Sequence, residues 1–248
     1  MSDGRDPIRA AQANMRRPEI KRFYSAADVQ ERDGGYALVL DGRLARTPGR
    51  NPLASRSRAL MERVAEEWRA QGETLDFFDM PLTRLLNAAL DGVAHTMAET
   101  RAATGAYAQT DLLCYRAEEP EALAERQRQA FDPVLAWAAE KFGAQFSLGA
   151  GLIAVPQPPE ALAGVRGALE SVDDPARLAG ISTITSLTGS VLLALAVADR
   201  RITPEDAWRA AHVDEDFQAE RWGVDAEAQA RRNARWREME AAGAVLRA

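Results

Sequence analysis

The sequence has very few of the side chains from which disulfides and metal sites are built. Its 248 residues include one cysteine, Cys114, and two histidines, His95 and His212. A single cysteine excludes an internal disulfide and favours a reducing compartment. These three side chains are also too few for a histidine-rich or thiolate-rich metal site.

Both histidines lie near carboxylates in the sequence. His95 has Asp91 and Glu99 at four-residue steps, and His212 is followed by the acids of residues 214–216. Such spacing places the side chains on one face of a helix, where a divalent metal could bind. We interpret both sets as solvated helix surfaces and therefore expect no metal and no cofactor.

The chain also lacks a surplus of positive charge, since its formal net charge is -6. This disfavours a general binder of nucleic acid or anionic membranes, because phosphate binding needs a local cationic surplus. The N-terminus has no apolar run resembling a secretory signal, and Asp3, Asp6 and Glu19 argue against a transit peptide. We expect residues 1–20 to form a flexible arm. The expected compartment is the cytoplasm of a bacterium, or the mitochondrial matrix in a eukaryote.

Motifs of common enzyme sites are missing as well. The sequence contains no Gly-x4-Gly-Lys-Ser/Thr phosphate loop and no Gly-x-Ser-x-Gly turn. Gly149-Ala150-Gly151 lacks the third glycine of a dinucleotide site, and Cys114 has only Arg116 as a basic neighbour, which favours a buried thiol. We therefore expect that the protein is not an enzyme. The alternative is a small-molecule enzyme that uses carboxylates such as Asp111 or Asp132 in a cleft between two domains.

The longest uncharged stretch runs from Leu178 to Ala198. About twenty residues suffice to cross a membrane as a helix. However, the stretch is rich in serine and threonine and has no aromatic belt. We predict that it is the central helix of a helical domain, apolar on all sides from Val191 onward. A membrane anchor is the alternative.

Turn signals and hydrophobic periodicity divide the chain near Met80. Residues 23–47 combine β-favouring runs with tight turns at Asp33-Gly34-Gly35 and Asp41-Gly42, which predicts a small antiparallel meander. A helix that begins near Ser55 or Ser57 and ends at Gly72 is expected to cover it.

After Pro81, apolar residues recur at three- and four-residue steps, which predicts helices. The last segment, residues 225–248, is a polar, arginine-rich helix that we expect to dock loosely. The predicted fold class is α+β, with a β-rich domain at residues 21–80 followed by a larger all-helical domain at residues 81–248.

Four acids gather near the end of the predicted helical domain: Asp214, Glu215, Asp216 and Glu220. Asp216 and Glu220 are four residues apart, which costs helix stability, and Phe217 and Trp222 interrupt the acids. Two interpretations remain open: a solvated helix face with two core anchors, or a docking surface for a basic or polar partner. The arginines from Arg231 onward could partly neutralise the acids, and we disfavour a nucleic-acid site there.

An ordered set of short segments carries a resemblance to a known family. The segments are Arg22-Phe23-Tyr24, Asp41-Gly42-Arg43 with Arg46-Thr47-Pro48, Asn51-Pro52-Leu53, Glu67-Trp68 with Gln71-Gly72, Met80-Pro81-Leu82-Thr83-Arg84-Leu85 with Asn87, Tyr107 with residues 110–116, Arg126-Gln127 with Asp132-Pro133 and Trp137, and Glu215-Asp216-Phe217-Gln218 with Glu220-Arg221-Trp222-Gly223. In this order and spacing the chain resembles the Atp-twelve chaperone family.

The resemblance implies a small β-rich domain followed by a helical domain. It also implies a molecular chaperone that binds the unassembled α subunit of the ATP synthase F(1) head, without hydrolysing ATP. The family's acidic C-terminal positions fall on Glu215 and Glu220. Together with Asp216 and Trp222, these residues form the predicted partner-binding set. We expect the chaperone to cover the α subunit until a β subunit replaces it.

Overall fold

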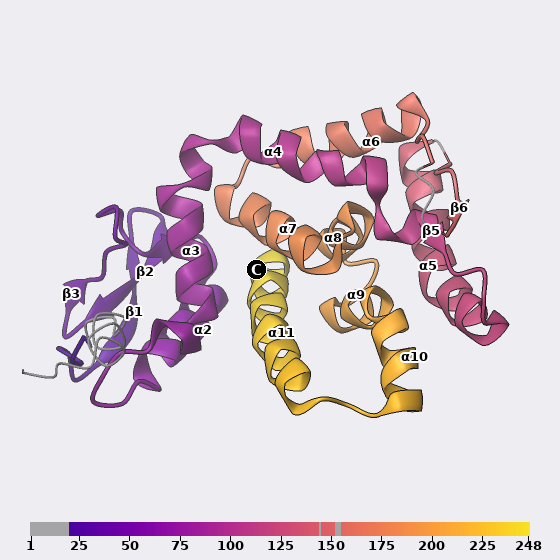
Figure 1. Ribbon diagram of the computed structural model, residues 1–248. Helices are drawn as coiled ribbons and strands as arrows, with labels where there is room; N and C mark the ends of the chain where they lie inside the picture. The colour runs from indigo at the N-terminus through magenta and orange to yellow at the C-terminus, as the bar shows by residue number, and fades with distance from the viewer. Residues whose placement is uncertain (1–19, 144, 152–154) are drawn as a thin grey trace, which may run out of the picture.

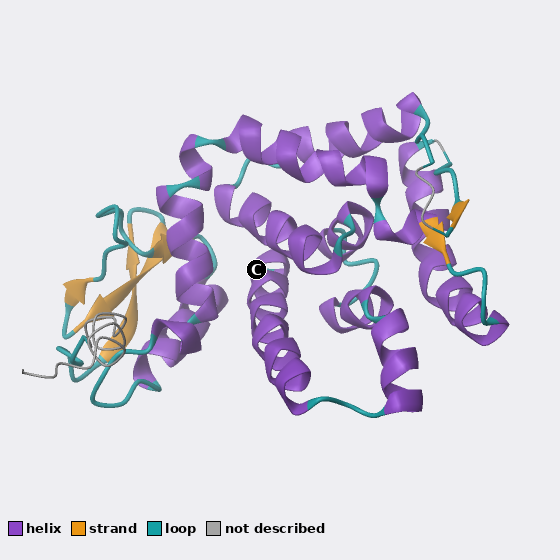
Figure 2. Cartoon of the chain, in the orientation of Figure 1, coloured by secondary structure: helices purple, strands orange, loops and turns teal. Residues whose placement is uncertain are grey.

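The fold combines a small β-sheet at one end with a larger array of helices, as Figures 1 and 2 show. The structure is a computed structural model that describes residues 20–143, 145–151 and 155–248. The predicted α+β class, β-rich first and helical afterwards, is confirmed. The boundary that we predict near Met80 stays a prediction, because one continuous set of buried apolar side chains extends through both parts.

The sheet is built around β2. Its strands are β1 (Ala27–Arg32), β2 (Gly35–Leu40), β3 (Arg43–Leu44) and β4 (Ala54–Ser55). β1 pairs antiparallel with β2 from Ala27 opposite Leu40 to Arg32 opposite Gly35. The connecting turn has positive φ at Asp33 and Gly34, which matches the right-handed twist of a tight hairpin. The predicted meander is therefore present.

Helix α2 (Arg58–Arg69) covers this sheet. The Ser57 hydroxyl accepts a hydrogen bond from the Leu60 amide at 3.2 Å, which begins the helix. The expected apolar stripe is buried, from Leu60 through Val64 to Trp68. Its burial supplies the hydrophobic face that a small sheet needs.

The remaining helices follow one another with short connections. They are α3 (Pro81–Asp91), α4 (Met97–Ala106), α5 (Glu121–Phe142), α6 (Pro159–Glu170), α7 (Pro175–Thr188), α8 (Val191–Ala198), α9 (Pro204–Ala211), α10 (Val213–Trp222) and α11 (Ala226–Arg247). Short 3-10 turns lie at Phe77–Asp79, Val93–His95, Tyr107–Thr110 and Leu112–Cys114. The helical part is not purely helical, since β5 (Tyr115–Arg116) and β6 (Gly149–Ala150) form a short parallel pair.

The uncharged stretch is central, but it forms two helices and not one. Gly189 adopts a left-handed conformation with φ of 69° after α7, and the Ser190 hydroxyl accepts a hydrogen bond from the Leu193 amide at 3.0 Å to begin α8. Every residue of α8 is buried. Threonine hydroxyls in α7 donate hydrogen bonds to backbone carbonyls of the same helix. The Thr185 hydroxyl, for example, donates to the Ile181 carbonyl at 2.8 Å. This explains how a hydroxyl-rich stretch lies in a core.

None of the helices among the described residues is both long enough and apolar enough to cross a membrane. The break at Gly189 shortens the one stretch that suggested a membrane anchor. The expectation of a domain centre is confirmed by the burial of Leu178, Ile181 and Ile184 in α7.

The last helix docks tightly, so the expectation of loose docking is wrong. α11 packs along α7 and also contacts α3, α8 and α9 (Figure 1). All residues from Ala241 to Leu246 are buried. Small residues at 241–244 let the helix approach its neighbours closely: a Cβ built on Gly180 of α7 would lie 3.3 Å from the Ala242 carbonyl oxygen. The sequence analysis gave weight to large apolar residues and overlooked these small ones.

A glycine substitution tests this docking. A Cβ on Gly243 would lie 2.4 Å from Cγ of Pro204, so Gly243→Ala should destabilise the protein by about 1–3 kcal/mol through overpacking. Gly167 in α6 is the matched control, because nothing lies within 4 Å of its Cβ position. Gly167→Ala should be neutral or stabilise by up to about 1 kcal/mol, as expected in a helix interior. Urea unfolding of both variants measures the difference, and equal stabilities would contradict tight docking.

Helix α3 is tied to the β-rich part at both ends. At its start, the Glu67 carboxylate accepts hydrogen bonds from the Leu82 and Thr83 amides at 2.7 and 2.8 Å. At its end, Asp91 accepts hydrogen bonds from the Thr47 hydroxyl at 2.5 Å and from the Asn51 side-chain amide at 2.8 Å. Several segments that carry the family resemblance therefore build this joint between sheet and helices.

Candidate partner-binding surface

The predicted acidic residues lie on α10, which one aromatic side chain anchors. Phe217 is the buried residue of α10, and the guanidinium groups of Arg126 and Arg221 lie 5.2 and 4.1 Å from its ring centre. These distances suit cation–π contacts. α10 packs against α5 and α9 and ends at Gly223 (φ of 83°), after which the chain turns toward α11 (Figure 1).

Three of the acids are engaged within the protein. Glu220 receives two hydrogen bonds from Arg126 of α5, at 2.8 and 2.7 Å, and this pairing lowers the pKa of Glu220. Asp216 pairs with Arg232 of α11, and Asp214 accepts a hydrogen bond from the Gln127 side chain at 2.7 Å. These contacts hold α10 in place, so Asp216 and Glu220 have a structural role that the sequence analysis missed.

Glu215 differs from its neighbours. It is exposed and, within the part of the chain that the structure describes, its carboxylate makes no hydrogen bond and no ion pair. Its charge acts on Arg232 and His212 through space, and its oxygens are open to a partner.

Next to Glu215 a groove of about 480 Å³ lies between α10 and α11. At its end Trp222 is 85% exposed and Val224 is 62% exposed. A tryptophan with this exposure has most of its indole in water, which is unfavourable unless another surface covers it. The surface formed by Glu215, Trp222 and Val224, which we call the α10 surface, therefore combines a free carboxylate with exposed apolar groups.

Of these residues, the sequence analysis named Glu215 and Trp222 as partner-binding candidates, and it named neither Val224 nor the pairing of Arg126. Val224 is an apolar residue directly after Gly223, in a turn between two polar helices, and that was the available signal. Arg126 lies in one of the family-like segments, but its pairing with a residue 94 positions later is a tertiary contact.

His212 is not on a solvated face, so that expectation is wrong. Its side chain is buried, its ring centre lies 3.9 Å from that of Trp208, and Nδ1 is 2.8 Å from the Trp208 carbonyl oxygen. Burial lowers the pKa of His212. Its contacts with Trp208 hold it at the junction of α9 and α10.

The other candidate residues do not form a reactive centre. Cys114 is buried as expected, and burial raises the pKa of its thiol to about 12. Asp111 is fully buried, and burial raises its pKa to about 6, but its oxygens accept hydrogen bonds from the Leu113 and Leu192 amides. Asp132 is exposed and pairs with Arg116 at 2.5 Å. The two carboxylates of the enzyme alternative thus serve as a helix cap and as the partner of a mostly buried arginine.

Asp91, which precedes His95 by four residues, is also hydrogen-bonded. It accepts hydrogen bonds from Thr47 and Asn51 in the joint with the β-rich part. Across residues 20–143, 145–151 and 155–248, no group of three or more histidine, cysteine, aspartate or glutamate side chains is arranged to hold a metal ion.

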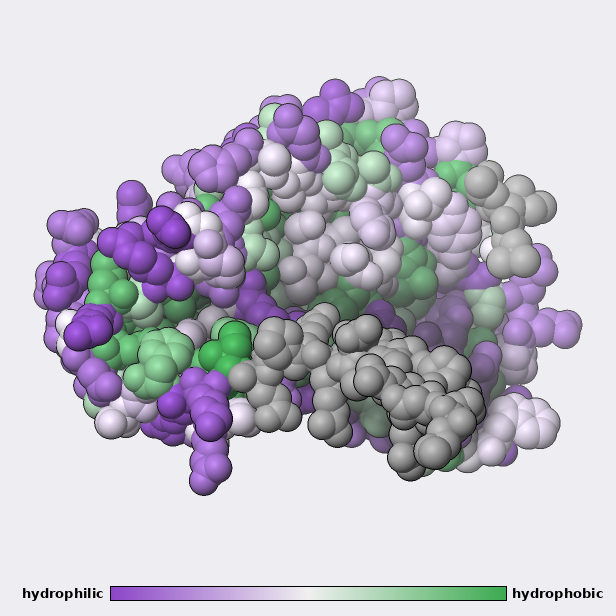
Figure 3. Space-filling view, turned by 60° about the vertical axis from the view of Figure 1, so that its left-hand side comes forward, coloured by the Kyte–Doolittle hydropathy of each residue, from purple (hydrophilic) through white to green (hydrophobic). Residues whose placement is uncertain are grey.

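Apolar groups are also exposed on the β-rich part. Phe23 is 67% exposed at a hollow of about 580 Å³ that Arg43, Arg46 and Trp68 also line. Figure 3, which turns this side forward, shows hydrophobic residues gathered among hydrophilic ones on this face. Apolar side chains are therefore exposed in two separate places, on the α10 surface and on the β-rich part.

A protein with a β-rich start, a helical remainder and separate exposed apolar surfaces has the features of a binder of other polypeptides. The family model of the ATP12 chaperone protein matches residues 21–139. The crystal structure of Atp12 from Paracoccus denitrificans is 39% identical, over 92% of this chain and 97% of that chain, with a TM-score of 0.84. The chain belongs to the ATP12 chaperone family, which is the Atp-twelve family of the sequence resemblance.

Two further structures are similar to this chain. The crystal structure of the Atu1473 protein, a candidate chaperone from Agrobacterium tumefaciens, is 44% identical, over 99% of this chain and 92% of that chain, with a TM-score of 0.87. A mutant of P. denitrificans Atp12p, with lysine in place of an aspartate, matches with 39% identity and a TM-score of 0.84, over 92% of this chain and 97% of that chain. Membership of this family makes the protein a chaperone of ATP synthase assembly.

Proposed function

We propose that the protein binds the unassembled α subunit of the ATP synthase F(1) head, prevents its aggregation and hands it on to the β subunit. The observation that carries the proposal is the 85% exposure of Trp222 beside the unpaired Glu215. Tryptophan is enriched among residues that dominate binding energy at protein interfaces, and a nearby carboxylate adds selectivity for a basic or polar partner. Membership of the ATP12 chaperone family supports a client that is a subunit of ATP synthase.

The mechanism that we propose is competition. The chaperone covers the surface of the α subunit that later faces a β subunit, and the β subunit displaces it. Binding to the free subunit shifts that subunit's equilibrium away from aggregation by mass action, so no energy source is needed. The chaperone then requires no catalysis, metal or cofactor, and it acts where F(1) is assembled, in the bacterial cytoplasm or the mitochondrial matrix.

All four predicted residues belong to this proposal, in two roles. Glu215 and Trp222 contact the client directly. Asp216 and Glu220 contribute negative charge at the flank and hold α10 in position through Arg232 and Arg126.

Light scattering of purified α subunit, alone and with an equimolar amount of this protein, tests the proposed function. We expect scattering to be suppressed, and an unrelated acidic protein of similar size serves as the control. Unchanged aggregation of the α subunit would refute the proposed function.

A further inference from the structure

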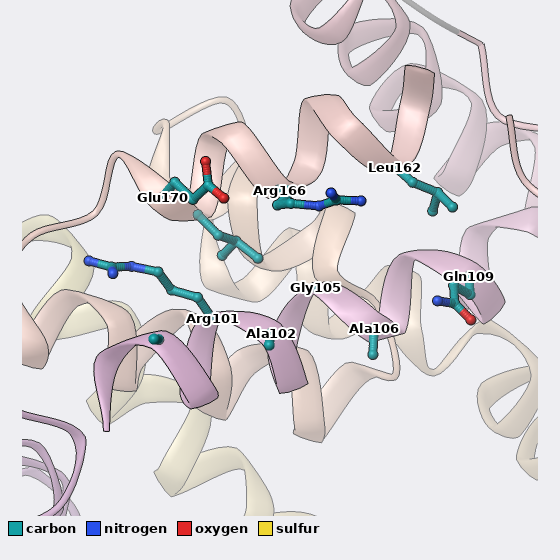
Figure 4. Close-up of a pocket in the computed structure, with 10 residues that line it drawn as sticks. Arg101, Ala102, Gly105, Ala106, Gln109, Leu162, Arg166 and Glu170 are labelled. Carbon is teal, nitrogen blue, oxygen red and sulfur yellow. The ribbon is translucent and has the colours of Figure 1, made fainter. Parts of the chain in front are cut away.

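A second groove of about 430 Å³ lies between α4 and α6 (Figure 4), and no residue of α10 lines it. One wall consists of small residues of α4, among them Ala102, Gly105 and Ala106, and the other includes Leu162 and Leu169 of α6. A Cβ built on Gly105 would lie 3.3 Å from a Leu169 methyl, so the helices approach each other closely at the floor. Ala102 and Ala106 are exposed, so the groove is an uncovered apolar face with room for another chain.

The charge around this groove is mainly positive. Arg166 extends along the space between the two helices in Figure 4, and no described residue forms an ion pair or hydrogen bond with its guanidinium. Arg101 donates from Nη2 to the Val172 carbonyl at 2.6 Å, but its buried Nε has no hydrogen-bond acceptor among the described residues. Glu170 is the carboxylate among the lining residues. An occupant that pairs with the Arg166 guanidinium brings a carboxylate of its own.

The dimensions suit a short helix. α4 has 10 residues and α6 has 12, so the two walls are roughly 15 and 18 Å long at about 1.5 Å per residue. That length accommodates about three turns of a third helix, and small residues on one wall let its backbone come close.

We propose that the α4–α6 groove binds an amphipathic helix of the client polypeptide, with medium-sized apolar side chains facing the groove and a carboxylate toward Arg166. This proposal rests on the proposed function, because it assigns a second contact to the same client. The protein's own N-terminal residues are less well matched in charge, since residues 1–19 contain Arg5, Arg9, Arg16 and Arg17 against three acids.

Two pairs of variants test the groove. Ala102→Trp fills it, and Ala103→Trp adds the same side chain to the same helix at an exposed position that does not line it. Arg166→Glu reverses the charge at the groove, and Arg63→Glu makes the same change at an exposed position of α2. Thermal unfolding of all four verifies the fold. We expect Ala102→Trp and Arg166→Glu to weaken binding of purified α subunit at least tenfold, and both controls to bind within about twofold of the unchanged protein.

A photo-crosslinking amino acid at position 102 gives an independent readout, and it should attach to the α subunit while the same group at position 103 should not. If the unchanged protein binds the α subunit and Ala102→Trp and Arg166→Glu bind it equally well, the groove proposal is overturned. The proposed function is not affected by that result. Failure of the unchanged protein to bind would overturn the proposed function and, with it, this proposal. The groove would belong to a second copy if Ala102→Trp altered the oligomeric state. It would belong to residues 1–19 if their deletion strengthened binding, and either result would also overturn the proposal.

Discussion

A protein carrying Trp222→Ala and Glu215→Lys is expected to bind unassembled α subunit about a hundredfold more weakly, with an unchanged Tm. Removing an exposed tryptophan at the centre of an interface typically costs about 2 kcal/mol or more, and a tenfold loss corresponds to about 1.4 kcal/mol. Neither side chain is buried, and Glu215 makes no hydrogen bond or ion pair among the described residues. Its charge acts on Arg232 and His212 only through space, and such exposed interactions contribute little to stability. Titration calorimetry with purified α subunit gives the affinity.

Two comparisons make this prediction specific. Glu66→Lys changes an exposed acid of α2 by the same charge and should bind normally. The exchanged pair Arg126→Glu with Glu220→Arg keeps an ion pair between α5 and α10 but removes the contact of Arg126 with Phe217, so its Tm is measured together with its binding. Weakened binding with a normal Tm would mean that the client contacts Glu220 itself. Full binding by the protein with Trp222→Ala and Glu215→Lys would exclude the α10 surface from the interface.

The stability of the protein should also depend on pH through Asp111. Burial raises the pKa of Asp111 from its ordinary 3.8 to about 6, against the hydrogen bonds from Ser190 and the Leu192 amide, which lower it. A raised pKa in the folded state means that the folded protein binds the proton more tightly than the unfolded chain does. The stabilising contribution is therefore complete below about pH 4 and is lost as the pH rises through about 6. The difference between the folded and unfolded pKa values of Asp111 corresponds to about 3 kcal/mol of unfolding free energy.

The variant Asp111→Asn isolates this effect, because its amide does not titrate. Other carboxylates with lowered pKa values, such as Asp41, Asp91 and Asp206, oppose the trend, but they are present in both proteins and cancel in the difference. We expect the stability of the unchanged protein relative to Asp111→Asn to fall by about 3 kcal/mol between about pH 4 and about pH 7.5. Urea unfolding at several pH values gives this difference, and a constant difference would show that Asp111 titrates normally.

Local patterns were sufficient to predict much of the fold. The turn at Asp33-Gly34, the stripe on α2 and the proline that begins α3 are set by neighbouring residues, and each is where the sequence placed it. The break at Gly189 was not predicted, because hydropathy alone does not register a left-handed glycine inside an apolar stretch. The tight docking of α11 was missed for a related reason: alanine and glycine contribute through the close approach that they permit, which depends on the partner helix.

The candidate site was predicted only in part. Acidic and aromatic residues at 214–222 marked α10 as unusual, but which acids are free depends on Arg126 and Arg232, which come from other helices. The burial of His212 likewise depends on its stacking against Trp208 and on how α9 packs. The α4–α6 groove left no motif in the sequence, because alanines on an exposed helix face look the same whether or not another helix lies beside them.

Competition between subunits is the centre of this account, and a single reconstitution tests it most directly. Purified α subunit is mixed with this protein, β subunit is then added, and each stage is followed by size-exclusion chromatography with native mass spectrometry. The account predicts a complex of the protein with the α subunit that disappears as α and β subunits assemble and the protein is released. The absence of any complex with the α subunit, or a complex that persists with the β subunit bound to it, would contradict it.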